Sequence, residues 1–78
     1  MSLKELIKSI AEELVDHPDQ VVVTEIVGEN NTLIELRVAE GDVGKVIGKE
    51  GRTAQSMRTL LAAMSTKTGQ RAHLDIVD

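Results

Sequence analysis

The sequence contains no cysteine, no phenylalanine, no tyrosine and no tryptophan, and only one proline. Without cysteine the chain forms no disulfide and offers neither a thiol nucleophile nor a Cys-ligated metal site. Without aromatic residues its core must be aliphatic, and no site on it can stack a ligand on a ring. Its uninterrupted apolar runs are far shorter than the roughly 20 residues that span a bilayer, so we expect no membrane segment.

What remains is the composition of a small folded domain. The chain has 78 residues, of which 41% are hydrophobic and 28% charged, enough for one aliphatic core. The N-terminus lacks a secretory pattern because Lys4, Glu5 and Lys8 interrupt its apolar positions. We therefore expect a single domain over residues 1–78, located in the cytoplasm.

Charge is distributed unevenly along the chain. The formal net charge is −4, which argues against a general polyanion binder. Residues 1–42 carry ten acids and three bases, a net −7, whereas residues 43–78 carry a net +3. Within residues 43–74 the only acid is Glu50, and this stretch carries +5. Such asymmetry favours contact with a polyanion, although two solvated faces that merely differ in charge would give the same count.

The first elements predicted are an amphipathic helix and a β-hairpin. Apolar residues between Leu3 and Val15 recur at the spacing of one helical face, and Ser2 with Glu5 matches a capping box. His17-Pro18 should end this helix, since the residue before proline is pushed out of the α region. Residues 21–27 and 34–38 predict two strands, joined by a turn at 28–31 whose residues tolerate positive φ.

Glycine then dominates the middle of the chain, with four of the six glycines between residues 40 and 51. Asp42 is expected to cap a short helix over residues 43–47. A long helix should follow from about Arg52 and end at Gly69, a residue suited to a left-handed C-terminal cap. Alternation over residues 72–76 predicts a third strand. The apolar face of the long helix comprises Ala54, Met57, Leu60, Leu61 and Met64.

The predicted order is therefore α-β-β-α-α-β. The hairpin makes the first two strands antiparallel, and the helical crossover makes the second and third parallel, with right-handed connection. The fold class is α+β: a three-stranded mixed sheet with helices packed on one face.

The loop Gly48-Lys49-Glu50-Gly51 is the main candidate site. Without Cβ atoms at its two glycines, a nucleic-acid backbone can approach the main chain closely. The amides and dipole at the start of the following helix favour phosphate oxygens, and Lys49 and Arg52 add charge-assisted contacts. The alternative is that this loop is simply a tight turn between two helices.

Neighbouring residues distinguish this loop from the chain's other G-x-x-G segment, residues 41–44. That segment contains Asp42, whose carboxylate would repel a phosphate. Around residues 48–51, by contrast, Ile47, Ala54 and Met57 are expected to form an apolar floor for bases, which needs no aromatic ring.

With this loop and element order, the whole chain resembles the KH domain, in which a G-x-x-G loop clamps four nucleotides of single-stranded RNA. The order is similar to the bacterial type II form, and the length to small stand-alone bacterial KH proteins. The resemblance implies a post-transcriptional regulator or RNA chaperone, which forms homodimers or pairs with a larger Jag-like KH protein. Glu50 departs from the basic or small residue that suits a phosphate. The implied RNA-binding residues are Lys45, Ile47, Gly48, Lys49, Glu50, Gly51, Arg52, Met57, Arg58 and Arg71, the last lying with His73 on the opposite wall.

Other chemistries find little support. A phosphate-binding P-loop requires G-x-x-x-x-G-K-[ST], but Gly44-Lys45 is followed by Val46. Two histidines without cysteine do not make a zinc site. We therefore expect no enzymatic activity, cofactor, metal or small-molecule substrate. The remaining alternative is a protein-interaction module that docks through its acidic hairpin or first helix and pairs with a larger KH-containing partner.

Overall fold

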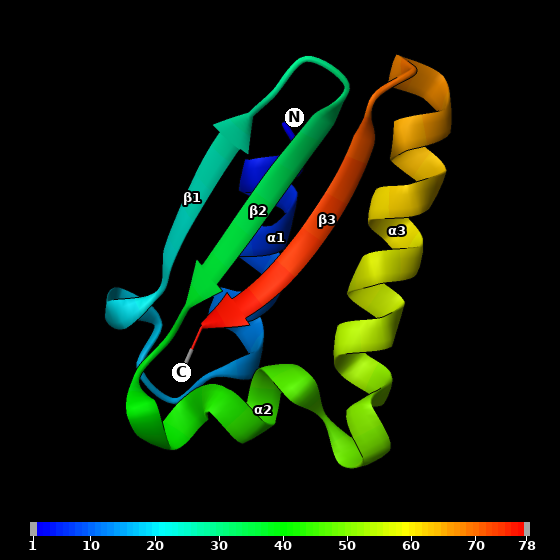
Figure 1. The fold of residues 1–78 in the computed structure, drawn as a ribbon. Helices are drawn as coiled ribbons and strands as arrows, with labels where there is room; N and C mark the ends of the chain where they lie inside the picture. Colours follow the sequence, from blue (N-terminus) through cyan, green and yellow to red (C-terminus); the bar gives the residue numbers. More distant parts are fainter. Residues whose placement is uncertain (1, 78) are drawn as a thin grey trace.

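The computed structural model describes residues 2–77, apart from the side chain of Thr68 (Figure 1). The predicted domain, 1–78, also includes Met1 and Asp78, which lie outside the described residues. The order α-β-β-α-α-β is confirmed, with three short 3-10 turns added. The elements are α1 Leu3–Leu14, η1 Pro18–Gln20, β1 Val22–Val27, β2 Asn31–Arg37, η2 Glu40–Asp42, α2 Val43–Ile47, η3 Lys49–Gly51, α3 Arg52–Thr68 and β3 Arg71–Val77.

The three strands form one mixed sheet in the order β1-β2-β3. The β1–β2 pair is antiparallel and the β2–β3 pair parallel, as predicted. The hairpin closes with a 2.7 Å hydrogen bond from Gly28 N–H to Asn31 O. None of its four turn residues takes positive φ, so that part of the turn prediction is wrong. Within residues 2–77, β3 pairs with β2 alone, so its other side is a sheet edge, which lies beside α3 (Figure 1).

Two helix ends lie where local sequence rules place them, whereas α1 ends at Leu14, before the predicted end at His17-Pro18, because Val15 is already extended. Ser2 Oγ accepts a 3.1 Å hydrogen bond from Glu5 N–H at the start of α1, as a capping box requires. At the other end of the chain, Gly69 takes the left-handed conformation with φ 75°, and its N–H bonds Ser65 O to close α3.

Both long helices cover the same face of the sheet, α1 behind β1 and β2 and α3 along β3 (Figure 1). Their inward faces meet the strands in an aliphatic core. Leu60 does not belong to it: this residue is 45% exposed, because the buried stripe of α3 runs through Ala54, Met57 and Leu61. The core cluster comprises Ile7, Ala11, Val15, Val21, Val23, Ile34, Leu36, Val38, Val46, Met57, Leu61 and Leu74.

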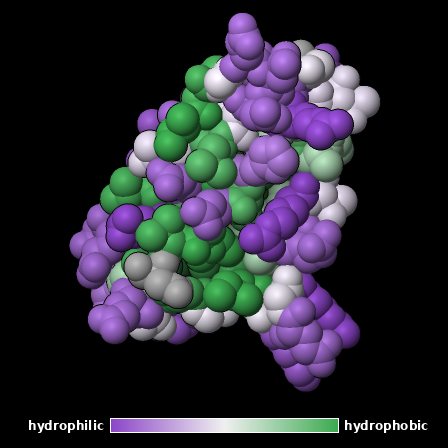
Figure 2. All heavy atoms as spheres, in the orientation of Figure 1, coloured by the Kyte–Doolittle hydropathy of each residue, from purple (hydrophilic) through white to green (hydrophobic). Residues whose placement is uncertain are grey.

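In the described part of the chain, no helix covers the opposite face of the sheet (Figure 1). On this face hydrophobic side chains lie interspersed with polar ones (Figure 2), and Val22 and Ile26 of β1 remain 53% and 50% exposed. Among residues 2–77, no helix combines the length and apolar character needed to cross a bilayer.

Candidate nucleic-acid interface

The G-x-x-G loop connects α2 to α3 through three residues with positive φ. Gly48 has φ 80° and ψ 172°, and Gly51 has φ 74°. Glu50 also takes the left-handed conformation, with φ 57°, and it is the only non-glycine residue of the described chain to do so. This conformation turns the chain from α2 into α3 within four residues (Figure 1) and places Lys49 and Glu50 at the exposed apex of the turn.

The two glycines of the loop serve different purposes. A Cβ on Gly48 would collide with Thr53 Oγ1 and lie 2.8 Å from Thr53 N, so this position is closed by the chain's own α3. A Cβ on Gly51 would meet nothing within 4 Å. The expectation that both glycines open the main chain to a ligand is therefore wrong for Gly48, which fits the tight-turn alternative. At Gly51 the space over the main chain is open.

Charged side chains surround the loop. Lys49 is exposed and has no carboxylate partner within residues 2–77. Glu50 Oε2 lies 3.2 Å from Arg52 Nη2, with the two side chains 65% and 79% exposed. Glu50 therefore neutralises Arg52 rather than Lys49 in this structure, and one cation of the loop stays free.

The predicted apolar floor is only partly present. Ile47 is 38% exposed beside the loop, but Ala54 is 3% and Met57 2% exposed. Both of these residues point into the core because α3 packs its 54-57-61 stripe against the sheet. The placement of Met57 on a wall of the site is therefore wrong, whereas its alternative interpretation as a core residue is confirmed.

β3 carries the residues predicted for the opposite wall. Arg58 of α3 donates from Nη2 to the main-chain oxygen of Leu74 across 3.4 Å, so one predicted contact residue bridges the helix and the edge strand. Arg71 and His73 are exposed on β3, as the strand alternation predicted. In Figure 1 the loop lies at the start of α3, and β3 begins beside the other end of that helix.

Comparison with known proteins agrees with this geometry. A family model for the KH domain of KhpA and KhpB matches residues 4–76. The chain belongs to the KhpA/KhpB KH-domain family. Relatives named RNA-binding protein KhpA include those of Aquifex aeolicus, 49% identical over 99% of this chain and 98% of the relative. That of Caldanaerobacter subterraneus is 52% identical over 94% of this chain and 97% of the relative.

Solved structures show the same fold. Aquifex aeolicus Era bound to GDP and AlF4− aligns with a TM-score of 0.62 at 20% identity, over 95% of this chain and 29% of the Era chain. Era in complex with MgGDPNP and a 16S ribosomal RNA segment aligns equally well, over 28% of that chain. The sequence-based assignment to a type II-like KH fold is thus confirmed.

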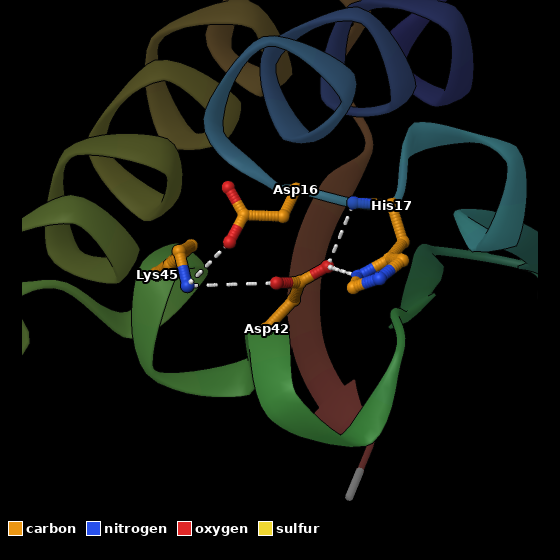
Figure 3. A network of polar contacts seen from close by, with 4 residues as sticks. All are labelled: Asp16, His17, Asp42 and Lys45. Carbon is orange, nitrogen blue, oxygen red and sulfur yellow. Dashed lines mark hydrogen bonds and ion pairs between the residues drawn. The ribbon is translucent and has the colours of Figure 1, made fainter.

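In this KhpA/KhpB-family chain, the buried carboxylate of Asp42 ties the segment just before α2 to His17, beyond the end of α1. The Asp42 side chain is 2% exposed, and its Oδ2 accepts a 3.0 Å hydrogen bond from His17 N–H. The same oxygen lies 3.1 Å from His17 Nδ1, while Lys45 Nζ lies 3.6 Å from Asp42 Oδ1 and 3.2 Å from Asp16 Oδ2 (Figure 3). Asp42 makes no side-chain cap on α2, so the predicted cap is wrong.

These contacts shift the pKa values of Asp42 and Lys45. Burial raises the pKa of the Asp42 carboxyl, but the hydrogen bonds from the ring and main chain of His17 outweigh burial, and the pKa is lowered overall. The Asp16 carboxylate raises the pKa of Lys45. Lys45, one of the predicted RNA-binding residues, directs its ammonium group to Asp16 just beyond the end of α1, and its side chain remains 42% exposed. No group of three metal-ligating side chains occurs in the described part of the chain.

Proposed function

We propose that this protein binds short single-stranded RNA on the side bordered by the G-x-x-G loop, α3 and β3. The observation that carries the proposal is the exposed Lys49 next to an open Gly51 at the start of the 17-residue α3. Helix N-termini hold phosphates through free amides and the dipole. The name that the relatives carry, RNA-binding protein KhpA, supports the same ligand.

Each group has a proposed role. The hydrogen bonds of the loop use the amides of Gly51 and Arg52, which bond Gly48 O and Lys49 O. The amides of Lys49 and Glu50, at the apex, are the proposed phosphate donors. Lys49 contributes a charge-assisted contact, and the exposed part of Ile47 supplies an apolar surface for a base.

The test replaces the two residues at the apex of the loop and leaves both glycines in place. Lys49→Asp together with Glu50→Asp changes the net charge by −2 and keeps a residue type that tolerates the left-handed conformation at position 50. We expect loss of single-stranded RNA binding in a fluorescence titration, with an unchanged circular dichroism spectrum. Lys8→Glu, on the exposed side of α1, makes the same charge change away from the loop and is the matched control.

The outcomes separate charge from position. Equal losses of RNA affinity in both variants would mean that net charge alone, and not the position of the loop, determines binding. Unchanged binding in the apex variant would overturn the assignment of the loop. Regulation of transcripts or RNA chaperoning remains a proposal that follows only from such binding, and location in the cytoplasm likewise remains a prediction.

A second proposal concerns protein partners. The uncovered sheet face, with Val22 and Ile26 about half exposed, supports pairing with a second copy or with a KhpB-type KH protein. One family model describes the KH domains of both KhpA and KhpB, which favours this idea. Sedimentation with and without RNA, comparing wild type with Ile26→Glu, tests it: we expect a self-associated wild type and a monomeric variant.

A further inference from the structure

A hollow lies at the far end of the α3–β3 side, away from the loop. It has a volume of about 430 Å³, within the range of sites that hold a small organic group. The C-terminal half of α3 and the first residues of β3 form its walls. Its lining includes Ala62, Ser65, Thr66, Gly69, Arg71 and His73.

This hollow continues the proposed RNA side rather than opening on another face. Gln55, Arg58 and Ala62 follow one another at spacings of three and four residues, so they share one stripe of α3. In the middle of this stripe Arg58 reaches the Leu74 oxygen of β3. With a rise of about 1.5 Å per residue, Ala62 lies about 15 Å along the helix from Arg52.

The chemistry of the lining fits a nucleotide. None of the lining residues is acidic, while Arg71 is a permanent cation at the rim and is exposed. Ala62, Gly69 and Ala72 make a small-residue surface, against which a flat ring can lie. Thr66 Oγ1 donates to Ala62 O across 3.2 Å, and the lone pairs of that hydroxyl can accept from a base N–H.

We propose that this hollow binds a nucleotide of the same RNA strand, beyond the segment that the G-x-x-G loop holds. The base lies on the small residues and Arg71 contacts its phosphate. The inference rests on the proposed RNA binding and extends it: the site is longer than the four nucleotides that a G-x-x-G loop clamps. An oligonucleotide confined to the loop cannot use the hollow, whereas a longer strand can.

The test compares a tetranucleotide with an octanucleotide of single-stranded RNA, using wild type, Ala62→Leu and Ala63→Leu. Ala62 lines the hollow; Ala63 is its exposed neighbour and does not. We expect wild type to bind the octanucleotide several-fold more tightly than the tetranucleotide. Ala62→Leu should abolish that gain without weakening tetranucleotide binding, and Ala63→Leu should retain it.

A second variant measures the phosphate contact. Arg71→Gln should reduce the slope of log affinity against log salt by about 0.7 for the octanucleotide, the value for one phosphate on a single strand. Lys8→Gln, on the exposed side of α1, removes one cation away from the hollow and should leave the octanucleotide slope unchanged. A circular dichroism spectrum unchanged from wild type is the check that each variant is folded.

Every outcome has a distinct meaning. If wild type binds neither oligonucleotide, the proposed function fails and this extension fails with it. If wild type binds both equally, or Ala62→Leu keeps the length gain, the hollow is not part of the RNA site, although the proposed function stands. Altered sedimentation in Ala62→Leu alone, with unchanged octanucleotide affinity, would assign the hollow to a protein partner and overturn the proposal.

Discussion

Replacing each loop glycine by alanine separates the role of the turn from the role of the ligand site. Gly48, at φ 80° and ψ 172°, occupies a region that essentially only glycine adopts, and a side chain there is destabilising by about 1–3 kcal/mol. The added Cβ would also collide with Thr53 Oγ1 and lie 2.8 Å from the main-chain N of Thr53. Overpacking of this kind typically adds about 1–3 kcal/mol. We expect Gly48→Ala to destabilise the domain by about 4 kcal/mol, the sum of the two central values.

Gly51→Ala is the matched comparison. Gly51 has φ 74°, but a Cβ added there would have no neighbour within 4 Å, so only the left-handed conformation is unfavourable, by about 1–2 kcal/mol. A domain of this size has a total stability of about 4–12 kcal/mol, scaled from per-residue values. Gly51→Ala should therefore stay folded, while Gly48→Ala should be close to unfolding.

Urea denaturation followed by far-UV circular dichroism gives the measurement, because the chain has no tryptophan or tyrosine to follow by fluorescence. With a slope of about 1 kcal/mol/M, the midpoint should fall by about 1–2 M for Gly51→Ala and by about 4 M for Gly48→Ala. Thr53→Ala removes the nearest atom and should restore part of the stability of Gly48→Ala. Equal destabilisation of the two glycine variants, or no recovery with Thr53→Ala, would refute the reasoning.

Two further predictions concern charge. Glu50→Gln releases Arg52 from its 3.2 Å ion pair; since exposed pairs contribute about 0–1 kcal/mol, RNA affinity should rise by up to about fivefold, and Glu12→Gln on α1 should leave it unchanged. An unaltered affinity in Glu50→Gln would show that Arg52 does not reach RNA. The pKa of Asp42 is lowered from 3.8, so its ionised form stabilises the fold above that pH, and this stability is lost as pH falls below it. Thermal melts from about pH 6 to pH 3 should show a smaller loss in Asp42→Asn than in wild type; equal losses would contradict the assignment.

Sequence patterns predicted the architecture because the rules behind it are local. Helical spacing, strand alternation and the crossover rule depend on neighbours in the chain, and they gave the element order and both strand pairings. The predicted cap at Asp42 was wrong because the partner of this side chain is distant in the sequence. Its partner His17 lies 25 residues earlier and reaches it only when the end of α1 packs against the start of α2.

The site was predicted less completely than the fold. The G-x-x-G spacing located the loop, but spacing does not say which neighbour faces the missing Cβ, and at Gly48 it is Thr53. Likewise, apolar periodicity identified Met57 without deciding between core and surface, and packing against the sheet decided for the core. The Arg58 contact with Leu74 O joins α3 to β3, so no pattern among neighbouring residues in the sequence predicts it.

The basic stretch that first pointed to RNA is less positive in the fold than in the sequence. Of its six cations, Lys45 is paired with Asp16 and Asp42, and Arg52 with Glu50. Arg58 donates to a main-chain oxygen. Only Lys49, Lys67 and Arg71 lack such partners within residues 2–77. Lys49 and Arg71 are the two of these cations on the proposed RNA side, and at about 0.7 per phosphate on a single strand they give a salt slope of about −1.4. A measured slope much steeper than this would mean that RNA displaces the internal ion pairs, and a slope near zero would mean that phosphates are not what the protein holds.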